Sequence, residues 1–113
     1  MPSWKGNTVL KKYNVVISKD ALEDIEGIFK YISEILYEPY VARKIQKNLL
    51  IRIKTLEFMP NRNTVIDIEP YKQRGVRIFL VENYKVFYFV NEDEGRVYIL
   101  NVLYKHRDWQ SII

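Results

Sequence analysis

The sequence predicts an α+β fold: an N-terminal strand, an antiparallel two-helix hairpin, a three-stranded antiparallel meander and a short C-terminal tail, with both helices on one face of the sheet. Two patterns predict this order. Between residues 22 and 56, apolar residues recur at steps of three and four, which is typical of amphipathic helices. After residue 75, three runs rich in Val, Ile, Phe and Tyr are separated by polar turns, as in a β-meander.

The first strand and helix are indicated by a change of pattern near residue 18. The run Tyr-Asn-Val-Val-Ile-Ser at residues 13–18 predicts a strand. Ser18 and Asp20 are both candidate N-caps, and Asp20 with Glu23 has the spacing of a capping box. A helix of about 17 residues follows, and its apolar stripe consists of Leu22, Ile25, Phe29, Ile32 and Leu36.

The second helix begins near Pro39, because proline suits a first helical turn, where its missing N–H would have no partner. The stripe of this helix consists of Ala42, Ile45, Leu49, Ile53 and Leu56. The short connection predicts antiparallel helices. Tyr31, Tyr37 and Tyr40 cluster around the bend. The usual partial burial of tyrosine favours a packing role for them over a role as partner anchors.

The predicted strands of the meander span residues 76–81, 84–90 and 96–103. Their register depends on the turn at Glu82-Asn83. A two-residue turn places Arg77 across from Tyr88, whereas a three-residue turn places Arg77 on the same face as Lys85. The pattern leaves both registers open.

Positive charge is concentrated in one segment of the chain. The net charge is +4, and residues 39–63 carry six basic side chains against one acidic one, a local excess of five. Such an asymmetry favours an anionic partner, either nucleic acid or an acidic polypeptide. A solvated helix face is the simpler alternative.

Several classes of protein are excluded or disfavoured. The chain has no cysteine and one histidine, so we expect no disulfide, no metal site and no cofactor. No apolar run is long enough to span a membrane, and we expect a cytoplasmic protein with no membrane partner. Residues 1–12 are predicted to be a flexible extension, and residues 13–113 a single domain whose tail packs through Trp109, Ile112 and Ile113.

The order of these segments resembles a known family. The hairpin opens with Ala21-Leu22-Glu23-Asp24-Ile25, the meander contains Arg77-Ile78-Phe79-Leu80-Val81, and the chain ends in Tyr104-Lys105-His106-Arg107-Asp108-Trp109. From about Tyr13 to Ile113 the sequence resembles the RelE/ParE superfamily, the toxins of type II toxin–antitoxin systems. Its ending resembles ParE-like and plasmid-stabilisation proteins in particular.

The resemblance implies a cognate antitoxin with an acidic, partly disordered segment that folds on the toxin, and operator DNA reached only through that antitoxin. The basic second helix suits such a segment, and the expected contacts are Arg43, Lys47 and Lys54. The superfamily implies three functions for the chain. It would inhibit growth by cleaving ribosome-bound mRNA, inhibit growth by poisoning DNA gyrase, or act without toxicity as a co-repressor with its antitoxin.

Cleavage of RNA through the 2′-hydroxyl needs a base, an acid and cations at the phosphate. His106, Arg77 and Lys85 are the candidate catalytic residues, because His titrates near neutral pH and the two cations match basic positions of RNA-cleaving relatives. The candidate RNA-binding residues are Lys105, Arg107, Tyr84, Tyr88 and Tyr104.

Some positions depart from the RNA-cleaving pattern. Lys85 stands where RNA-cleaving relatives usually have arginine, and a lysine keeps the charge but cannot make the two parallel hydrogen bonds of a guanidinium. Phe79 stands at a position that is basic in RelE. A lone histidine after the last strand, as His106 is, is more often a partly exposed hydrogen-bonding residue than a catalyst. The sequence as a whole favours the mRNA endoribonuclease, with the gyrase poison as the alternative.

Overall fold

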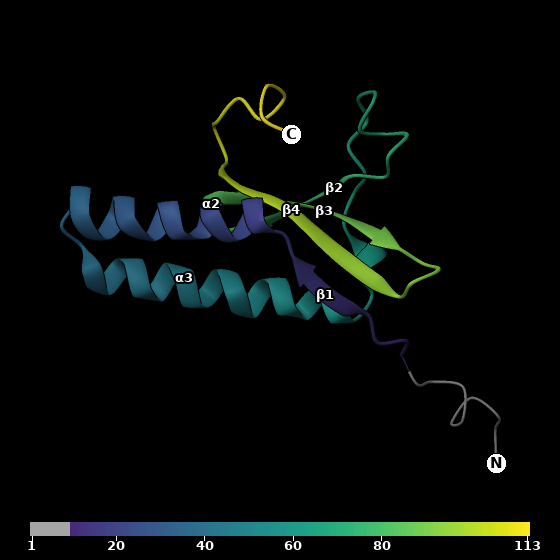
Figure 1. Cartoon of the computed structure of the whole chain (residues 1–113), viewed down its shortest axis with the longest axis horizontal. Coiled ribbons are helices and arrows are strands. Elements are labelled where there is room, and N and C mark those ends of the chain that lie inside the picture. Colours follow the sequence, from purple (N-terminus) through teal and green to yellow (C-terminus); the bar gives the residue numbers. More distant parts are fainter. Residues whose placement is uncertain (1–9) are drawn as a thin grey trace, which may run out of the picture.

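The computed structural model describes residues 10–113, and its elements follow the predicted order (Figure 1). The predictions made for residues 1–9 lie outside the described part of the chain. The elements are β1 (Asn14–Ile17), α2 (Lys19–Lys30), a π-helical turn η1 (Tyr31–Ile35), α3 (Pro39–Lys54), the 3₁₀ turns η2 (Thr55–Glu57) and η3 (Pro60–Arg62), and the strands β2 (Arg77–Val81), β3 (Tyr84–Asn91) and β4 (Arg96–Tyr104).

The four strands form one sheet in the order β1-β4-β3-β2. The predicted meander is confirmed, because β2 pairs antiparallel with β3 and β3 pairs antiparallel with β4. β1 pairs in parallel with β4, so the sheet is mixed. The helical hairpin is the connection that carries the chain from β1 back to the sheet.

The register of the meander is that of a two-residue turn. Val81 pairs with Tyr84 across Glu82-Asn83, and Arg77 therefore pairs with Tyr88. Side chains alternate between faces along a strand, so Arg77 shares the helix-covered face and Lys85 points to the opposite face. The alternative register, with Arg77 and Lys85 on one face, is wrong.

Both faces of the sheet bury apolar side chains. The helices cover one face, where Ile25, Leu49 and Ile53 pack against residues such as Val86 and Ile99. A second cluster lies on the other face and consists of Ile66, Tyr71, Val76, Phe87 and Leu103, with Ile78, Leu100, Trp109 and Ile113 packed against it. The C-terminal tail thus packs as predicted through Trp109 and Ile113, whereas Ile112 is exposed.

The start of α2 differs in detail from the prediction. Ser18 is the N-cap, and its Oγ accepts a hydrogen bond from the Ala21 N–H at 3.0 Å. Asp20 lies inside the first helical turn, so the predicted capping box with Glu23 does not form. Ser18 Oγ also donates to the Leu100 carbonyl at 3.0 Å, which ties the helix start to β4.

The tip of the helical hairpin is strained and exposes aromatic rings. In η1 the Leu36 N–H donates to the Tyr31 carbonyl, five residues back, and Tyr37 has a left-handed backbone with φ 56°. Tyr31, Tyr37 and Tyr40 are 55%, 82% and 71% exposed, so the packing role predicted for them is wrong. Figure 1 shows why: the tip projects beyond the sheet, which offers it nothing to pack against.

Glu92, in the turn between β3 and β4, joins three separate segments. Its carboxylate accepts hydrogen bonds from Tyr13 Oη at 2.7 Å and Asn61 Nδ2 at 2.9 Å, and lies 3.5 Å from Lys11 Nζ. The hydrogen bonds from Asn61 and Tyr13 hold the pKa of Glu92 below its usual value. The same carboxylate raises the pKa of the Tyr13 hydroxyl.

We predict that Glu92→Gln destabilises the protein near neutral pH and does so progressively less in acid. A carboxyl whose pKa is lowered by folding contributes stability above its unfolded pKa, and this contribution is lost as the pH falls through its folded pKa. Urea midpoints of both proteins, measured from pH 7 down to pH 3, should converge. Asp93→Asn in the same turn, for which no side-chain contact is seen within residues 10–113, is the control and should show no such convergence.

A second prediction concerns the turn of the meander. Glu82 is exposed and has φ 52°, a conformation that costs a non-glycine residue free energy. Glu82→Gly should raise the free energy of unfolding by about 0.5–1 kcal/mol, as measured by urea denaturation. Asn83→Gly, at a position without a positive φ, should be neutral or destabilising, and an equal gain in both variants would contradict this account.

Candidate functional site

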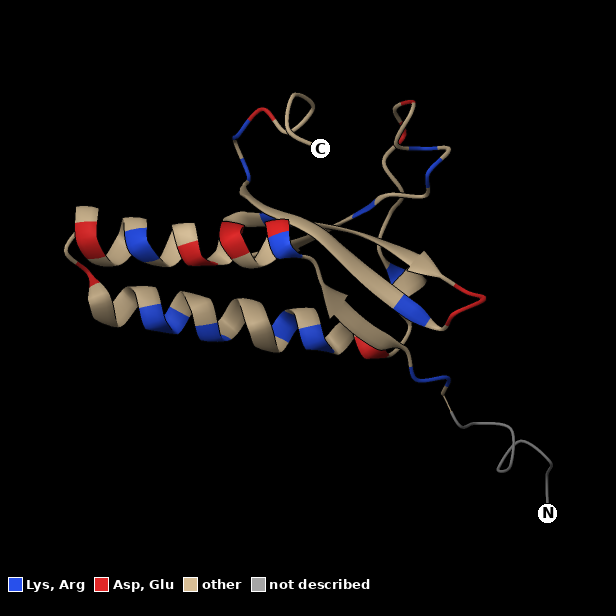
Figure 2. Cartoon of the chain, viewed as in Figure 1, with Lys and Arg blue, Asp and Glu red and all other residues tan. Residues whose placement is uncertain are grey.

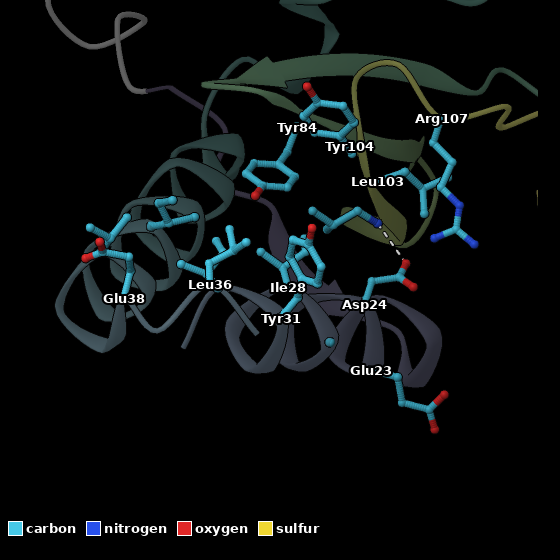
Figure 3. A pocket seen from close by; sticks show the side chains of 15 residues that line it. Glu23, Asp24, Ile28, Tyr31, Leu36, Glu38, Tyr84, Leu103, Tyr104 and Arg107 are labelled. Carbon is cyan, nitrogen blue, oxygen red and sulfur yellow. Dashed lines mark hydrogen bonds between the residues drawn. The ribbon is translucent and has the colours of Figure 1, made fainter. Parts of the chain in front are cut away.

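A groove of about 920 Å³ lies between the helical hairpin and one end of the sheet (Figure 3). Its apolar lining comes from both helices and from the strands, and consists of Ile28, Ile32, Leu36, Val41, Ile45, Val102 and Leu103. Ile28 and Tyr31 point into the space from the helix side, and Tyr84 and Tyr104 from the sheet side. The groove is therefore mostly apolar with a tyrosine at each wall.

The groove begins beyond the point at which α2 is hydrogen-bonded to the sheet. Asp24 Oδ2 accepts hydrogen bonds from the Val102 N–H at 2.9 Å and from Asn101 Nδ2 at 3.1 Å. Beyond this point α2 continues through η1 away from β4, and the apolar residues on its inner flank face open space. Leu36 is consequently 49% exposed, although it belongs to the predicted apolar stripe.

Carboxylates rather than cations lie at the helical rim of the groove. Glu23 and Glu38 line it from the hairpin, and Arg107 lines it from the end of β4. At the sheet wall, the rings of Tyr84 and Tyr104 meet edge to face at 6.2 Å, and burial raises the pKa of Tyr84. A partner that fills the groove would therefore be held mainly by apolar contacts.

Some of the predicted site residues do come together at this end of the sheet. Tyr104 packs edge to face against His106 at 5.4 Å, and Tyr84 and Arg107 line the same groove. The backbone N–H of Lys105 donates to the Asn83 carbonyl at 2.8 Å, which ties the start of the tail to the β2–β3 turn.

Arg77 lies at the other end of β2. Its guanidinium donates hydrogen bonds from Nη1 to the backbone carbonyls of Asn61 and Asn63. Arg77 lies four residue steps along the strand from Val81 at the turn, which is about 13 Å at 3.3 Å per residue. The side chain holds η3 and the residue that follows it against the sheet, at the end of β2 that is far from His106.

Tyr88, a predicted RNA-binding residue, is fully buried beside Arg77. Its hydroxyl donates to the Pro60 carbonyl at 2.6 Å and accepts from Asn63 Nδ2 at 3.0 Å, and burial raises its pKa. A ring with no accessible surface cannot stack on a base in this conformation. Tyr88 therefore serves as a core residue that anchors the same segment as Arg77.

The predicted antitoxin contacts lie outside the groove. Arg43, Lys47 and Lys54 are exposed on α3, and the groove is lined on this helix by Val41 and Ile45 instead. Lys54 Nζ lies 3.7 Å from a carboxylate oxygen of Glu57. Sequence reasoning missed the groove, although the apolar residues Ile28 and Val41 beside the predicted stripes were a signal that the hairpin has a second apolar flank.

Within residues 10–113 there is no group of three or more His, Asp or Glu side chains arranged to hold a metal ion. In the same residues, no helix combines the length and the apolar character that crossing a bilayer requires.

Comparison with known protein families gives one decisive match. The family described as "ParE toxin of type II toxin-antitoxin system, parDE" matches residues 15–109, nearly the whole described chain. The chain belongs to the ParE toxin family. It is thus a toxin of the type II toxin–antitoxin class, as the resemblance implied. No curated protein sequence matches it significantly.

Solved structures share the fold of this ParE-family toxin. A chain of the chromosomal ParDE system of P. aeruginosa has a TM-score of 0.68 at 20% identity, covering 83% of this chain and 97% of its own. The RelBE2 toxin–antitoxin complex of Mycobacterium tuberculosis has a TM-score of 0.58 at 17% identity, covering 82% and 98%. The archaeal RelE–RelB complex of Pyrococcus horikoshii OT3 has a TM-score of 0.58 at 20% identity, covering 85% and 98%.

The hydrogen bonds of Arg77 predict a structural role for this residue. Arg77→Ala leaves the Asn61 and Asn63 carbonyls without their donor and should lower the free energy of unfolding by about 1–3 kcal/mol, measured by urea denaturation. Lys85→Ala, which removes a cation from the opposite face, is the control and should change it by less than about 0.5 kcal/mol. Similar effects of the two substitutions would show that Arg77 is not a structural anchor.

Proposed function

We propose that this ParE-family chain is a growth-inhibiting toxin that acts by binding DNA gyrase in the cytoplasm, without cleaving RNA. The observation that carries the proposal is the separation of the candidate catalytic cations. Arg77 and Lys85 face opposite sides of the sheet, and the guanidinium of Arg77 is engaged by backbone carbonyls. This reverses the preference for an endoribonuclease that the sequence patterns favoured.

The chemical requirement explains why this separation matters. A base, an acid and a phosphate-binding cation must reach one phosphodiester within hydrogen-bonding distance. His106 lies beyond the end of β4 beside Tyr104, whereas Arg77 lies at the far end of β2. Of the candidate site residues, Tyr84, Tyr104 and Arg107 line the groove and His106 does not, which supports a binding role for this end of the sheet.

The projecting hairpin tip supplies a surface suited to a protein target. Its exposed apolar and aromatic residues are Tyr31, Ile35, Leu36, Tyr37, Tyr40 and Val41. Tyrosines are enriched at the energetic centres of protein interfaces, because they bury a large rigid ring and keep a polar end. A π-helical turn and a strained backbone at Tyr37 coincide with this patch, and both features are common at functional sites.

The antitoxin is proposed to bind in the groove. The similar solved structures include toxin–antitoxin complexes, and the groove offers an apolar floor open at the surface. An amphipathic helix that lays its apolar side chains into such a groove is a common mode of recognition. The groove continues into Tyr31, Leu36 and Val41 of the tip, so an antitoxin bound there would also cover part of the target surface.

The choice between gyrase poison and endoribonuclease is tested with three single substitutions, two at the candidate catalytic residues His106 and Lys85 and one at the candidate RNA-binding residue Arg107. We expect His106→Ala, Lys85→Ala and Arg107→Ala each to keep at least about half of the growth inhibition after induced expression. The purified wild-type protein should inhibit DNA supercoiling by gyrase and leave ribosome-bound message intact in a cell-free translation reaction. Cleaved message, together with loss of toxicity in His106→Ala, would restore the endoribonuclease. Harmless wild-type expression would favour the non-toxic co-repressor.

The groove assignment is tested with two matched substitutions on the first helical segment. Leu36 lines the groove and is 49% exposed, whereas Leu22 is 52% exposed and lies outside the groove lining. Leu36→Glu should weaken binding of the antitoxin encoded beside this gene by about tenfold or more, measured by calorimetry. Leu22→Glu should change the affinity by less than about threefold, and equal effects would remove the groove from the antitoxin interface.

A further inference from the structure

The two long helices of the hairpin carry opposite charge. α3 contains five basic residues and no acidic one, whereas α2 contains two basic and four acidic residues. Figure 2 shows this contrast as blue bands alone along α3 and a row of red bands along α2. The positive excess that the sequence places in residues 39–63 is therefore a property of one helix surface.

Most of this charge lies on the outer face of α3. At 100° per residue, Arg43, Lys44 and Lys47 fall on the side of the helix away from the buried residues Ala42 and Leu49. All three cations are exposed, and none forms an ion pair with a residue that the structure describes. Lys54 extends the row by a further two turns.

Several lysines on other elements have acidic partners. Lys19 Nζ lies 3.9 Å from Glu23, Lys30 Nζ 3.0 Å from Glu26 and Lys72 Nζ 3.1 Å from Asp67. Their charges are locally compensated, so they add little to the field that a distant polyanion meets. Arg43, Lys44 and Lys47 are therefore a group of uncompensated cations on one helix, whereas Lys54 at the end of the row lies 3.7 Å from Glu57.

We propose that the outer face of α3 binds the phosphate backbone of duplex DNA directly, through Arg43, Lys44, Lys47 and Lys54. From Arg43 to Lys54 the helix rises about 16 Å at 1.5 Å per residue. Duplex DNA presents one negative charge per about 1.7 Å of axis, so a straight row of cations of this length meets several phosphates at once. The helix holds the row straight, which lowers the entropic cost of binding a stiff duplex.

The shape of the surface favours DNA over an acidic protein segment. The face is a helix surface on which Leu50 and Ile51 lie exposed. The pocket beside Leu50 is a small one of about 300 Å³, and the polar residues Asn14, Lys54 and Glu57 contribute to its lining. A protein helix gains its affinity by burying apolar side chains, and the groove that permits this is lined by other residues and has Glu23 and Glu38 at its rim. Binding of the DNA backbone requires only the positive charge and no apolar cleft.

This assignment is independent of the cellular target of the toxin. It also leaves the groove free, so the antitoxin and DNA would occupy different surfaces of one toxin molecule. The expectation that operator DNA is reached only through the antitoxin would then be incomplete, because the toxin would add phosphate contacts of its own.

The experiment measures fluorescence anisotropy of a labelled 30-base-pair duplex of arbitrary sequence, titrated with the full chain at several salt concentrations. The test variant carries Arg43→Gln, Lys44→Gln and Lys47→Gln, and the control carries Lys19→Gln, Lys30→Gln and Lys72→Gln. Both lose three positive charges. Thermal melting followed by circular dichroism verifies that both variants are folded.

We expect the wild type to bind with a plot of log K against log salt of slope about −3.6, since each phosphate neutralised by one of the four cations contributes about −0.9. The test variant should bind about 10- to 100-fold more weakly at low salt, with a slope near −1, and the control should stay within about threefold. Equal losses in both variants, or no binding by the wild type, would overturn the proposal. So would a test variant that keeps DNA binding but loses binding to a 20-residue poly-glutamate peptide, which would assign the face to an acidic polypeptide.

Discussion

The pairing of Val81 with Tyr84 across a two-residue turn decides which side of the sheet every side chain of β2 and β3 faces. It sends Phe79, Val86 and Tyr88 under the helices, where they form much of the main core. It also turns Arg77 toward η3 and the residue that follows it, whose carbonyls it binds, and Lys85 toward the opposite face. A slip of one residue would exchange these environments and expose the core.

The length of the helical hairpin relative to the sheet has the next largest effect. One part of the hairpin is anchored to β4 through Asp24 and buries Ile25, Leu49 and Ile53. The other part extends past the sheet, which leaves an apolar groove on its inner flank and aromatic side chains at its tip. The exposed apolar surfaces of this protein thus lie where the amphipathic helices extend beyond the sheet that would bury their apolar faces.

Much of the fold could be predicted because local patterns determine it. The stripes containing Ile25 and Leu49 and the alternation in the meander are properties of short segments, and the structure has them where they were expected. The register of β2 against β3 and the exposure of Leu36 and Tyr37 were beyond prediction, since they depend on turn geometry and on how far the hairpin projects. The placement of the predicted catalytic cations Arg77 and Lys85 on opposite faces was beyond prediction for the same reason: residue types at plausible spacings carry no information on which face of a sheet they occupy.

The order of the strands has a consequence for folding. β4 lies between β1 and β3 in the sheet, and the tail that follows it packs on the second face through Trp109 and Ile113. The pairing of β4 with β1 brings Asn14 opposite Arg96, so a long loop must close before this pairing stabilises the sheet. The two halves of the sheet are therefore joined by contacts between residues far apart in sequence, and contacts of this kind slow folding.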